Sequence, residues 1–435
     1  MGLSSDTHGS ESRLAAYVEA LTAALGHADR AAPFRSYCVG LLLPGARKSV
    51  EPMAARVAPA RVQAAHQSLH HFVAKADWSD EAVLGAVRAR VLPLIEVRGA
   101  IRGWMIDDTG LPKKGAHSVG VARQYCGQLG KQDNCQVAVT LSLANDHASL
   151  PIAHRLYLPQ GWADDPIRRA RAGVPDEIAF QTKPQIALAQ IRAALQAGIP
   201  PAPVLADAGY GIDTGFRDGI TKLGLLYIVG IQSSTSLWPP GTEPLAPKPW
   251  SGRGRRTSLV RRDAAHKPVS AKELANGLPK RAWRRVTWRE GSNTPLASRF
   301  AAVRVRPGHR DYWRPTPRPE EWCLIEWPTG EPQPTKYWLA TLPDKTPRRA
   351  LVNLAKLRWR IERDYQDLKQ ELGLGHYEGR GWRGFHHHAT LCIAAYGFLI
   401  AERATIPPSG QWQSQFFAEP TLSDDYRPRG AANPA

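Results

Sequence analysis

The chain has 435 residues, of which 57 are Lys or Arg and 39 are Asp or Glu, so its formal net charge at pH 7 is +18. A chain of this length can form two or three domains with a substantial core, and its excess of positive charge indicates a polyanionic partner. No run of about 18 apolar residues is present, which excludes a predicted membrane-spanning helix and a membrane partner.

Two further global features concern cellular location. The first ten residues have neither a basic start nor an apolar stretch, so no signal peptide is predicted. The five cysteines are odd in number, widely spaced and without a C-x-x-C pair. This pattern favours a reducing cytoplasm and argues against a structural zinc site.

Residues 1–95 are predicted to form a separate helical region. Helical periodicity is present at 13–25, 59–75 and 81–95. Basic residues within this region, Arg47 among them, favour a DNA-binding domain, whereas the alternative is an ordinary bundle that packs on the rest of the chain. Periodicity alone does not separate these interpretations.

Two short apolar runs end in aspartate. Trp104 to Ile106 lead into Asp107 and Asp108, and Val204 to Ala206 lead into Asp207. Both runs are typical of buried strands, and the carboxyl ends of strands are where open α/β sheets bind ligands. The alternative is that these aspartates only form turns that close the strands.

The order of the intervening elements is informative. Apolar runs predict antiparallel strands at 137–143 and 150–158, then a helix at 185–197 before Asp207 and a strand at 225–231. Together with a late helix, this gives three meandering strands, a helix, two further strands and a final helix.

The 154 residues between Asp207 and Glu362 predict an inserted subdomain, because a structureless loop of that length is improbable. Residues 251–320 hold 18 Lys and Arg against 5 Asp and Glu, and short alternating stretches predict strands at 284–288 and 302–305. A solvated basic surface is one interpretation. The other is DNA binding by phosphate neutralisation and base stacking. Its candidate residues are Trp283, Arg284, Arg285 and Trp288.

The stretch 354–374 is predicted to be an amphipathic helix. Its apolar stripe consists of Leu354, Leu357, Ile361, Tyr365, Leu368 and Leu372. Arg358, Glu362 and Lys369 fall together on the flank of this stripe. A solvated, salt-bridged face is the alternative. However, two strand-end aspartates followed by a helix glutamate also match the plan of a two-metal phosphoryl-transfer site.

The later segments carry less information. His386, His387 and His388 are consecutive, and neighbouring helical residues point about 100° apart, so we expect packing or phosphate contacts from them rather than a metal site. The segment from residue 406 onward is rich in Pro, Ser, Gln and Gly, which predicts a flexible tail.

Residues 95–400 resemble the DDE transposases of bacterial cut-and-paste insertion sequences, which have an RNase H-like catalytic fold. Their signature is Tyr, two residues, Arg, three residues, Glu, six residues, Lys. The chain has Ala355, Arg358, Glu362 and Lys369 at these positions, so three of the four residue types match. The departure at Ala355 puts the contact made by the family tyrosine in doubt.

The resemblance implies an α/β protein with an RNase H-like catalytic core, a β-rich insertion and an N-terminal helical domain. The expected segments are a helical DNA-end-binding domain at 1–95, the first part of the core at 96–232, the insertion at 233–335, the last part of the core at 336–405 and the tail at 406–435.

The implied catalytic residues and metal ligands are Asp108 (or, failing that, its neighbour Asp107), Asp207 and Glu362. They would hold two Mg²⁺ ions, for which Mn²⁺ would substitute. Arg358 and Lys369 are expected to contact phosphates. Lys113 and Lys114 could do the same or belong to a solvated loop.

The expected function is metal-dependent cleavage at element ends and strand transfer into target DNA. The expected partners are double-stranded DNA, both terminal inverted repeats and target, and a second copy of the chain. The expected location is the cytoplasm, with association to the nucleoid when DNA is bound. Two alternatives remain: an RNase H-like nuclease that joins no strands, and an inactive DNA-binding derivative.

Overall fold

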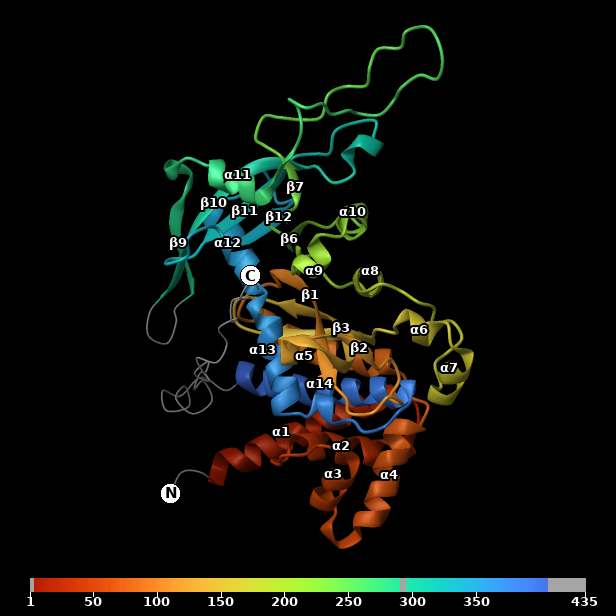
Figure 1. Cartoon of the computed structure of the whole chain (residues 1–435). Coiled ribbons are helices and arrows are strands. Elements are labelled where there is room, and N and C mark those ends of the chain that lie inside the picture. Colours follow the sequence, from red (N-terminus) through yellow and green to blue (C-terminus); the bar gives the residue numbers. More distant parts are fainter. Residues whose placement is uncertain (1–3, 290–294, 406–435) are drawn as a thin grey trace, which may run out of the picture.

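The computed structural model describes residues 4–289 and 295–405 (Figure 1). The predicted tail at 406–435 lies outside these residues. No helix within the described ranges has both the length and the apolar character needed to cross a bilayer.

A mixed sheet forms the centre of the molecule. Its first three strands are antiparallel neighbours: β2 (Ala122–Cys126) pairs with β3 (Lys131–Ala144), and β3 pairs with β1 (Gly103–Pro112). β4 (Ser149–Leu156) pairs with β3, while β5 (Val204–Ala206) and β6 (Tyr227–Ile231) run parallel to β1. The predicted strand order and the α/β class are therefore confirmed.

The basic insertion extends this same sheet. β12 (Lys336–Ala340) pairs antiparallel with β6, and β11 (Glu321–Trp327) and β10 (Leu296–Pro307) continue outward from it. The outer elements are β9 (Arg284–Arg289), β7 (Ser236–Trp238), β8 (Val269–Ser270) and the helix α11 (Ala271–Gly277). Figure 1 shows this part as one end of the molecule, continuous with the core.

The strand β1 presents alternate residues to two different helical layers. Met105 shares a buried cluster with Leu357 and Ile361, which belong to the helices α12 (Arg348–Leu357) and α13 (Trp359–Gln370). On the opposite face, the side chain of Asp108 reaches α8 (Lys183–Gln196). Successive residues of β1 therefore face different surroundings.

The helices before β6 are short and well capped. The predicted helix at 185–197 is confirmed as α8, which starts with a capping box between Thr182 and Gln185. Asp207 caps the one-turn helix α9 (Ala208–Gly211), and α10 (Thr214–Lys222) follows. Two other short helices, α6 (Gln160–Ala163) and α7 (Pro166–Ala172), connect β4 to α8.

The sequence predicted a single helix at 354–374, and this prediction is wrong in two ways. Arg358 separates α12 from α13, and α13 ends at Gln370. Arg358 keeps right-handed helical dihedrals, and its carbonyl accepts the N–H of Ile361, three residues on, at 3.1 Å. This tighter turn interrupts the α-helical ladder without reversing the chain. All six residues of the predicted apolar stripe are buried.

The N-terminal helices form a layer beneath the sheet (Figure 1). They are α1 (Ser4–Thr22), α2 (Ala31–Leu42), α3 (Val50–Val57), α4 (Val62–Ala74) and α5 (Asp80–Glu96), and they confirm the predicted helices. Between them and the sheet runs α14 (Trp382–Thr405), which contacts α2, α4, α5 and β4. A helix covered on several sides is mostly apolar around its circumference, and most buried residues of α14 are apolar, with His387, His388 and Thr390 as exceptions.

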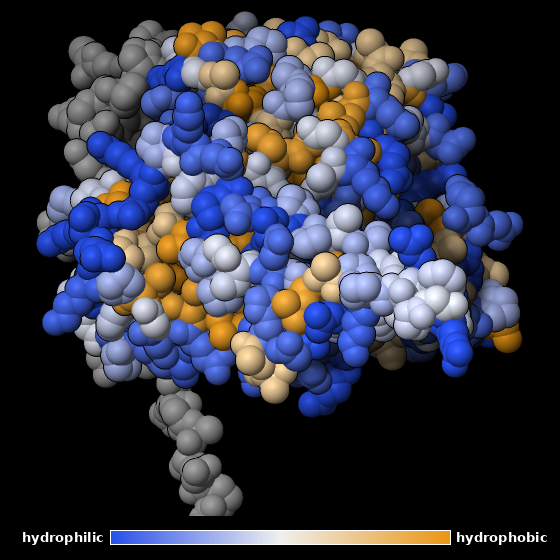
Figure 2. All heavy atoms as spheres, turned by 90° about the horizontal axis from the view of Figure 1, so that it is seen from above, coloured by the Kyte–Doolittle hydropathy of each residue, from blue (hydrophilic) through white to orange (hydrophobic). Residues whose placement is uncertain are grey.

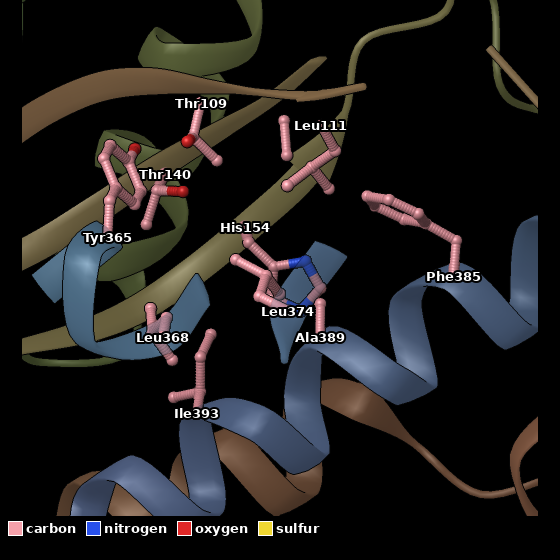
Figure 3. Close-up of a pocket in the computed structure, with 11 residues that line it drawn as sticks. Thr109, Leu111, Thr140, His154, Tyr365, Leu368, Leu374, Phe385, Ala389 and Ile393 are labelled. Carbon is pink, nitrogen blue, oxygen red and sulfur yellow. The ribbon is translucent and has the colours of Figure 1, made fainter. Parts of the chain in front are cut away.

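Packing between α14 and the sheet is close. Figure 3 shows residues of α13 and α14, including Tyr365, Leu368 and Ile393, turned toward Thr109 and Leu111 of β1. The cavity that they enclose has a volume of about 20 Å³, enough for one water molecule. The face of β1 that carries Asp107 is thus supported by a nearly filled core.

The three consecutive histidines of α14 connect it by hydrogen bonds to four other segments. His386 accepts the N–H of Leu156, His387 contacts the carbonyl of Trp78, and His388 contacts both the Tyr37 hydroxyl and the carbonyl of Gly373. Burial lowers the pKa of each imidazole to about 4. Their packing role is confirmed by these contacts.

These histidines predict acid sensitivity. The neutral imidazole of His388 is favoured in the folded state, so the unfolded state binds more protons between pH 6.5 and about 4, and stability falls as the pH falls through this window. We expect His388→Gln to reduce that dependence by up to about 1.4 kcal/mol per pH unit. Urea denaturation at several pH values measures it. His71→Gln, at an exposed position of α4, is the control and should retain the wild-type slope.

Candidate active site

Asp107 and Asp207 lie on neighbouring parallel strands. β1 and β5 pair with Ile106 opposite Ala206, so the two aspartates are the next residues along each strand. Neighbouring strands are about 4.8 Å apart, which places both carboxylates at one position on the sheet. The predicted convergence of the two motifs follows from this register.

Arg358 connects this position to the late helix. Its Nη1 lies 2.7 Å from Oδ2 of Asp107, and its Nη2 lies 2.9 Å from Oε1 of Glu362. The Glu362 side chain is 62% exposed, whereas that of Asp107 is 15% exposed. One guanidinium therefore holds together a half-buried carboxylate of the sheet and an exposed carboxylate of α13.

The charges of the site influence one another. Burial raises the pKa of Asp107 to about 7; Arg358 opposes that rise, while Asp207 and Asp108 add to it. Burial disfavours the charge of Arg358, but Asp107, Glu362 and Asp207 together raise its pKa above the usual value. Asp207 therefore belongs to the same electrostatic group.

Asp108 occupies a different environment. Its Oδ2 accepts hydrogen bonds from Nζ of Lys183 at 3.0 Å and from the Tyr210 hydroxyl at 3.2 Å. Because adjacent residues of a strand point to opposite faces, Asp108 faces α8 and α9 rather than α13. The structure thus groups Asp107 with Asp207 and Glu362 and sets Asp108 apart.

Asp207 also performs the turn role that the sequence allowed. Its Oδ1 accepts the backbone N–H groups of Gly209 at 2.9 Å and Tyr210 at 3.3 Å, which caps α9. Capping fixes the orientation of the carboxylate at the end of β5. The structural and the site-forming interpretations of this motif are therefore compatible.

The three lysines predicted to contact phosphate lie near the carboxyl end of β1, beyond the carboxylates, and Lys369 reaches this end from α13. Nζ of Lys369 donates to the carbonyl of Gly110 at 3.0 Å, and Nζ of Lys113 donates to the carbonyl of Tyr377 at 2.6 Å. Lys114 is exposed. Lys113 and Lys114 also line an open hollow of about 520 Å³. Its other charged or titratable residues are Arg47, His376, Tyr377 and Glu378.

The predicted aromatic residues of the insertion differ in exposure. Trp283 is buried and packs edge-on against Trp327, while Trp288 packs against Phe300 and lies 4.4 Å from Nζ of Lys356. Arg284 and Arg285 are exposed. Neither tryptophan presents a free face comparable to the exposed aromatic residues of this region, which are Trp250, Tyr312 and Trp313.

Trp250 lies just outside the basic segment at 251–320 that the sequence identified, so the sequence did not associate it with that segment. Figure 2, which looks down on the insertion end, shows hydrophilic side chains over much of this face with apolar groups between them.

Ala355 takes the place of the tyrosine in the motif described above. It is 8% exposed and belongs to a buried cluster with Val352, Phe300 and Ala340, where α12 packs on the sheet. This position faces the core, so its small side chain is explained by packing.

The fit to a divalent cation rests on the donor set. Within residues 4–289 and 295–405, no three His, Cys, Asp or Glu side chains already converge as a metal-binding group. Carboxylate oxygens are nevertheless the ligands that Mg²⁺ prefers, and the Arg358 guanidinium shows that a cation is stabilised between Asp107 and Glu362. The residues fit if Arg358 turns away from that position.

The two ion pairs of Arg358 predict different effects on stability. Arg358→Gln should lower the free energy of unfolding by about 1–3 kcal/mol, because the buried Asp107 loses its cationic partner. Glu362→Gln should change it by less than about 0.5 kcal/mol, because the Glu362 pair is exposed. Chemical denaturation of both variants measures this. Equal losses would contradict the assignment of Asp107 as the buried partner.

Comparison with known proteins places these observations in a family. Residues 20–295, more than half of the chain, match the model of the DDE superfamily endonucleases. The match includes β1 and β5 and ends before α13. Over 170 residues the chain is 35% identical to a probable transposase for the insertion sequence element IS701 of Microchaete diplosiphon. That alignment covers 39% of this chain and 41% of the relative.

Proposed function

The chain belongs to the DDE superfamily of endonucleases, and from that premise we propose that it is a DNA transposase. It would cut phosphodiester bonds at the ends of an insertion element and join the freed ends to target DNA. The single observation that carries this proposal is the group formed by Asp107, Asp207, Arg358 and Glu362 at one position on the sheet.

Within this proposal, Asp107 rather than Asp108 is the first catalytic carboxylate. Asp107 is on the face of β1 that α13 covers, and Arg358 links it directly to Glu362. Asp108 is committed to Lys183 and Tyr210 on the other face. The sequence placed Asp108 first, and geometry is the reason for preferring its neighbour.

Asp107, Asp207 and Glu362 would hold two Mg²⁺ ions, with Mn²⁺ as a substitute. When bound, such ions activate the attacking oxygen and stabilise the leaving oxygen of an in-line displacement. The chain itself would orient the DNA strand. Arg358 would leave the carboxylates to bind a phosphate, and Lys369 would neutralise a phosphate farther along β1.

The proposed substrate is double-stranded DNA, first the terminal repeats and then the target, within the cytoplasm. The surface that would bind it includes Lys113 and Lys114 beside the hollow and Arg284 and Arg285 on β9. Trp288 and Trp283 would support that surface by packing rather than by stacking on bases. A homodimer would bring two ends together.

Substitution of the carboxylates tests the catalytic assignment. With duplex DNA that spans the element ends and with Mg²⁺, we expect Asp107→Asn, Asp207→Asn and Glu362→Gln to lose cleavage by at least about 10³-fold, because each removes a charged ligand. Gel electrophoresis of labelled DNA measures cleavage. Binding to the same DNA should remain, since the carboxylates repel phosphate.

The same assay distinguishes the proposal from its alternatives. Cleavage without any strand joining would identify a nuclease, and binding without cleavage by the wild type would identify an inactive derivative. Full activity of Asp107→Asn would show that the first carboxylate is misassigned.

Salt dependence tests the role of the insertion. Arg284→Ala combined with Arg285→Ala should reduce the slope of log Kd against log salt concentration by about 1–2, because each phosphate contact contributes about 0.9. Fluorescence anisotropy of labelled end DNA measures the slope. Arg171→Ala, an exposed arginine of α7, provides the control. An unchanged slope in the double variant would remove β9 from the DNA interface.

A further inference from the structure

The proposed mechanism leaves three residues beside the site unexplained. Lys183 starts α8, Tyr210 lies in α9, and Asp108 is adjacent to the proposed ligand Asp107. The Tyr210 side chain is buried, and its hydroxyl donates to Oδ2 of Asp108, which also accepts from Lys183. We infer that Asp108, Tyr210 and Lys183 are positioning residues that hold the Asp207 carboxylate beside Asp107.

The connection runs through the backbone of Tyr210. Its N–H donates to Oδ1 of Asp207, while its side chain is anchored on β1 through Asp108. A single residue therefore joins the strand that carries Asp107 to the carboxylate that follows β5. Any shift of Tyr210 relative to β1 would turn the Asp207 carboxylate.

Two further contacts leave α9 little freedom to move in other directions. A Cβ atom on Gly211 would lie 1.9 Å from the carbonyl oxygen of Gly230 in β6, so the helix and strand approach closely there. The side chain of Arg217 donates to the carbonyl of Gly211 and, through Nη2, to the Thr214 hydroxyl at 3.3 Å. The Tyr210 hydroxyl is thus the contact that sets α9 against β1, while β6 and α10 fix its other sides.

Charge distribution supports the division of roles between the two adjacent aspartates. The Asp108 carboxylate is compensated by the ammonium of Lys183 on its own face of the sheet. The Asp107 carboxylate is compensated by Arg358, which the proposed mechanism releases to phosphate. The Asp108 carboxylate would keep its bonds to Lys183 and Tyr210 when DNA binds, and a positioning residue must keep its contacts in this way.

The inference rests on the proposed function, in which Asp107 and Asp207 share bound metal. Its test is the affinity of the whole chain for Mn²⁺ without DNA, measured by electron paramagnetic resonance titration. Tyr210→Phe keeps the backbone bond to Asp207 but releases Tyr210 from β1. Loss of outer contacts of a metal site reduces affinity by about 10–100-fold, so we expect a loss at the lower end, about 10-fold, with little change in Tm. Asp108→Asn should weaken it by less than Tyr210→Phe does, because the Asn oxygen still accepts from Tyr210 and only the ion pair with Lys183 is lost.

Two other variants calibrate this measurement. Asp107→Asn should lose high-affinity Mn²⁺ binding, and Tyr337→Phe should bind as the wild type does. Tyr337 is a matched control because it is also buried, and its hydroxyl donates to the carbonyl of Pro334, within the strand-to-strand connection before β12.

The outcomes separate the two proposals. If Asp107→Asn loses Mn²⁺ binding but Tyr210→Phe retains wild-type affinity, the positioning role is overturned and the proposed function stands. If Asp108→Asn abolishes binding as completely as Asp107→Asn does, Asp108 is a ligand and the inference is overturned. If Asp107→Asn binds Mn²⁺ normally, the proposed metal site itself fails.

Discussion

The central constraint in this molecule is the placement of several carboxylates within one small volume next to a hydrophobic core. Like charges repel, and burial disfavours each of them, so the group persists only with a cation among its members. Arg358 supplies that charge by bonding to both Asp107 and Glu362. Arg358 lies at the junction between α12 and α13. The buried apolar residues of both helices pack against the sheet, and this packing sets the position of the junction.

The support beneath this site extends through α14 to the N-terminal helices. The cavity between α14 and β1 is small, so displacement of the helix would be transmitted to the strand that carries Asp107. The three histidines bind α14 to β4, to the segment before α5 and to the segment after α13. The helical region therefore supports the sheet that carries the candidate site.

The insertion has a comparable relationship with the core. Since β12 pairs with β6, its strands extend the sheet that begins at β1. Backbone hydrogen bonds between neighbouring strands, and contacts between their side chains, therefore connect the insertion to the core within one continuous sheet. This geometry gives the basic strand β9 a fixed orientation relative to the candidate site, although the two are far apart in sequence.

The sequence patterns predicted the helices and strands of this protein well, because the spacing of apolar residues indicates which side of a helix or strand is buried. The stripe from Leu354 to Leu372 and the apolar runs before Asp107 and Asp207 identified the helix and strands that form the site. The spacing of Arg358, Glu362 and Lys369, taken together with the two strand-end aspartate motifs, indicated the family. Sequence could not predict the junction at Arg358, since it depends on contacts with the sheet.

Only the tertiary structure distinguished Asp107 from Asp108. Adjacent aspartates have the same chemistry, and their local sequence does not state which face of the strand the late helix covers. That choice depends on the register between β1 and β5 and on the packing of α13. As a result, Asp107 bonds to Arg358 and Asp108 bonds to Tyr210, because adjacent residues of a strand point to opposite faces of the sheet.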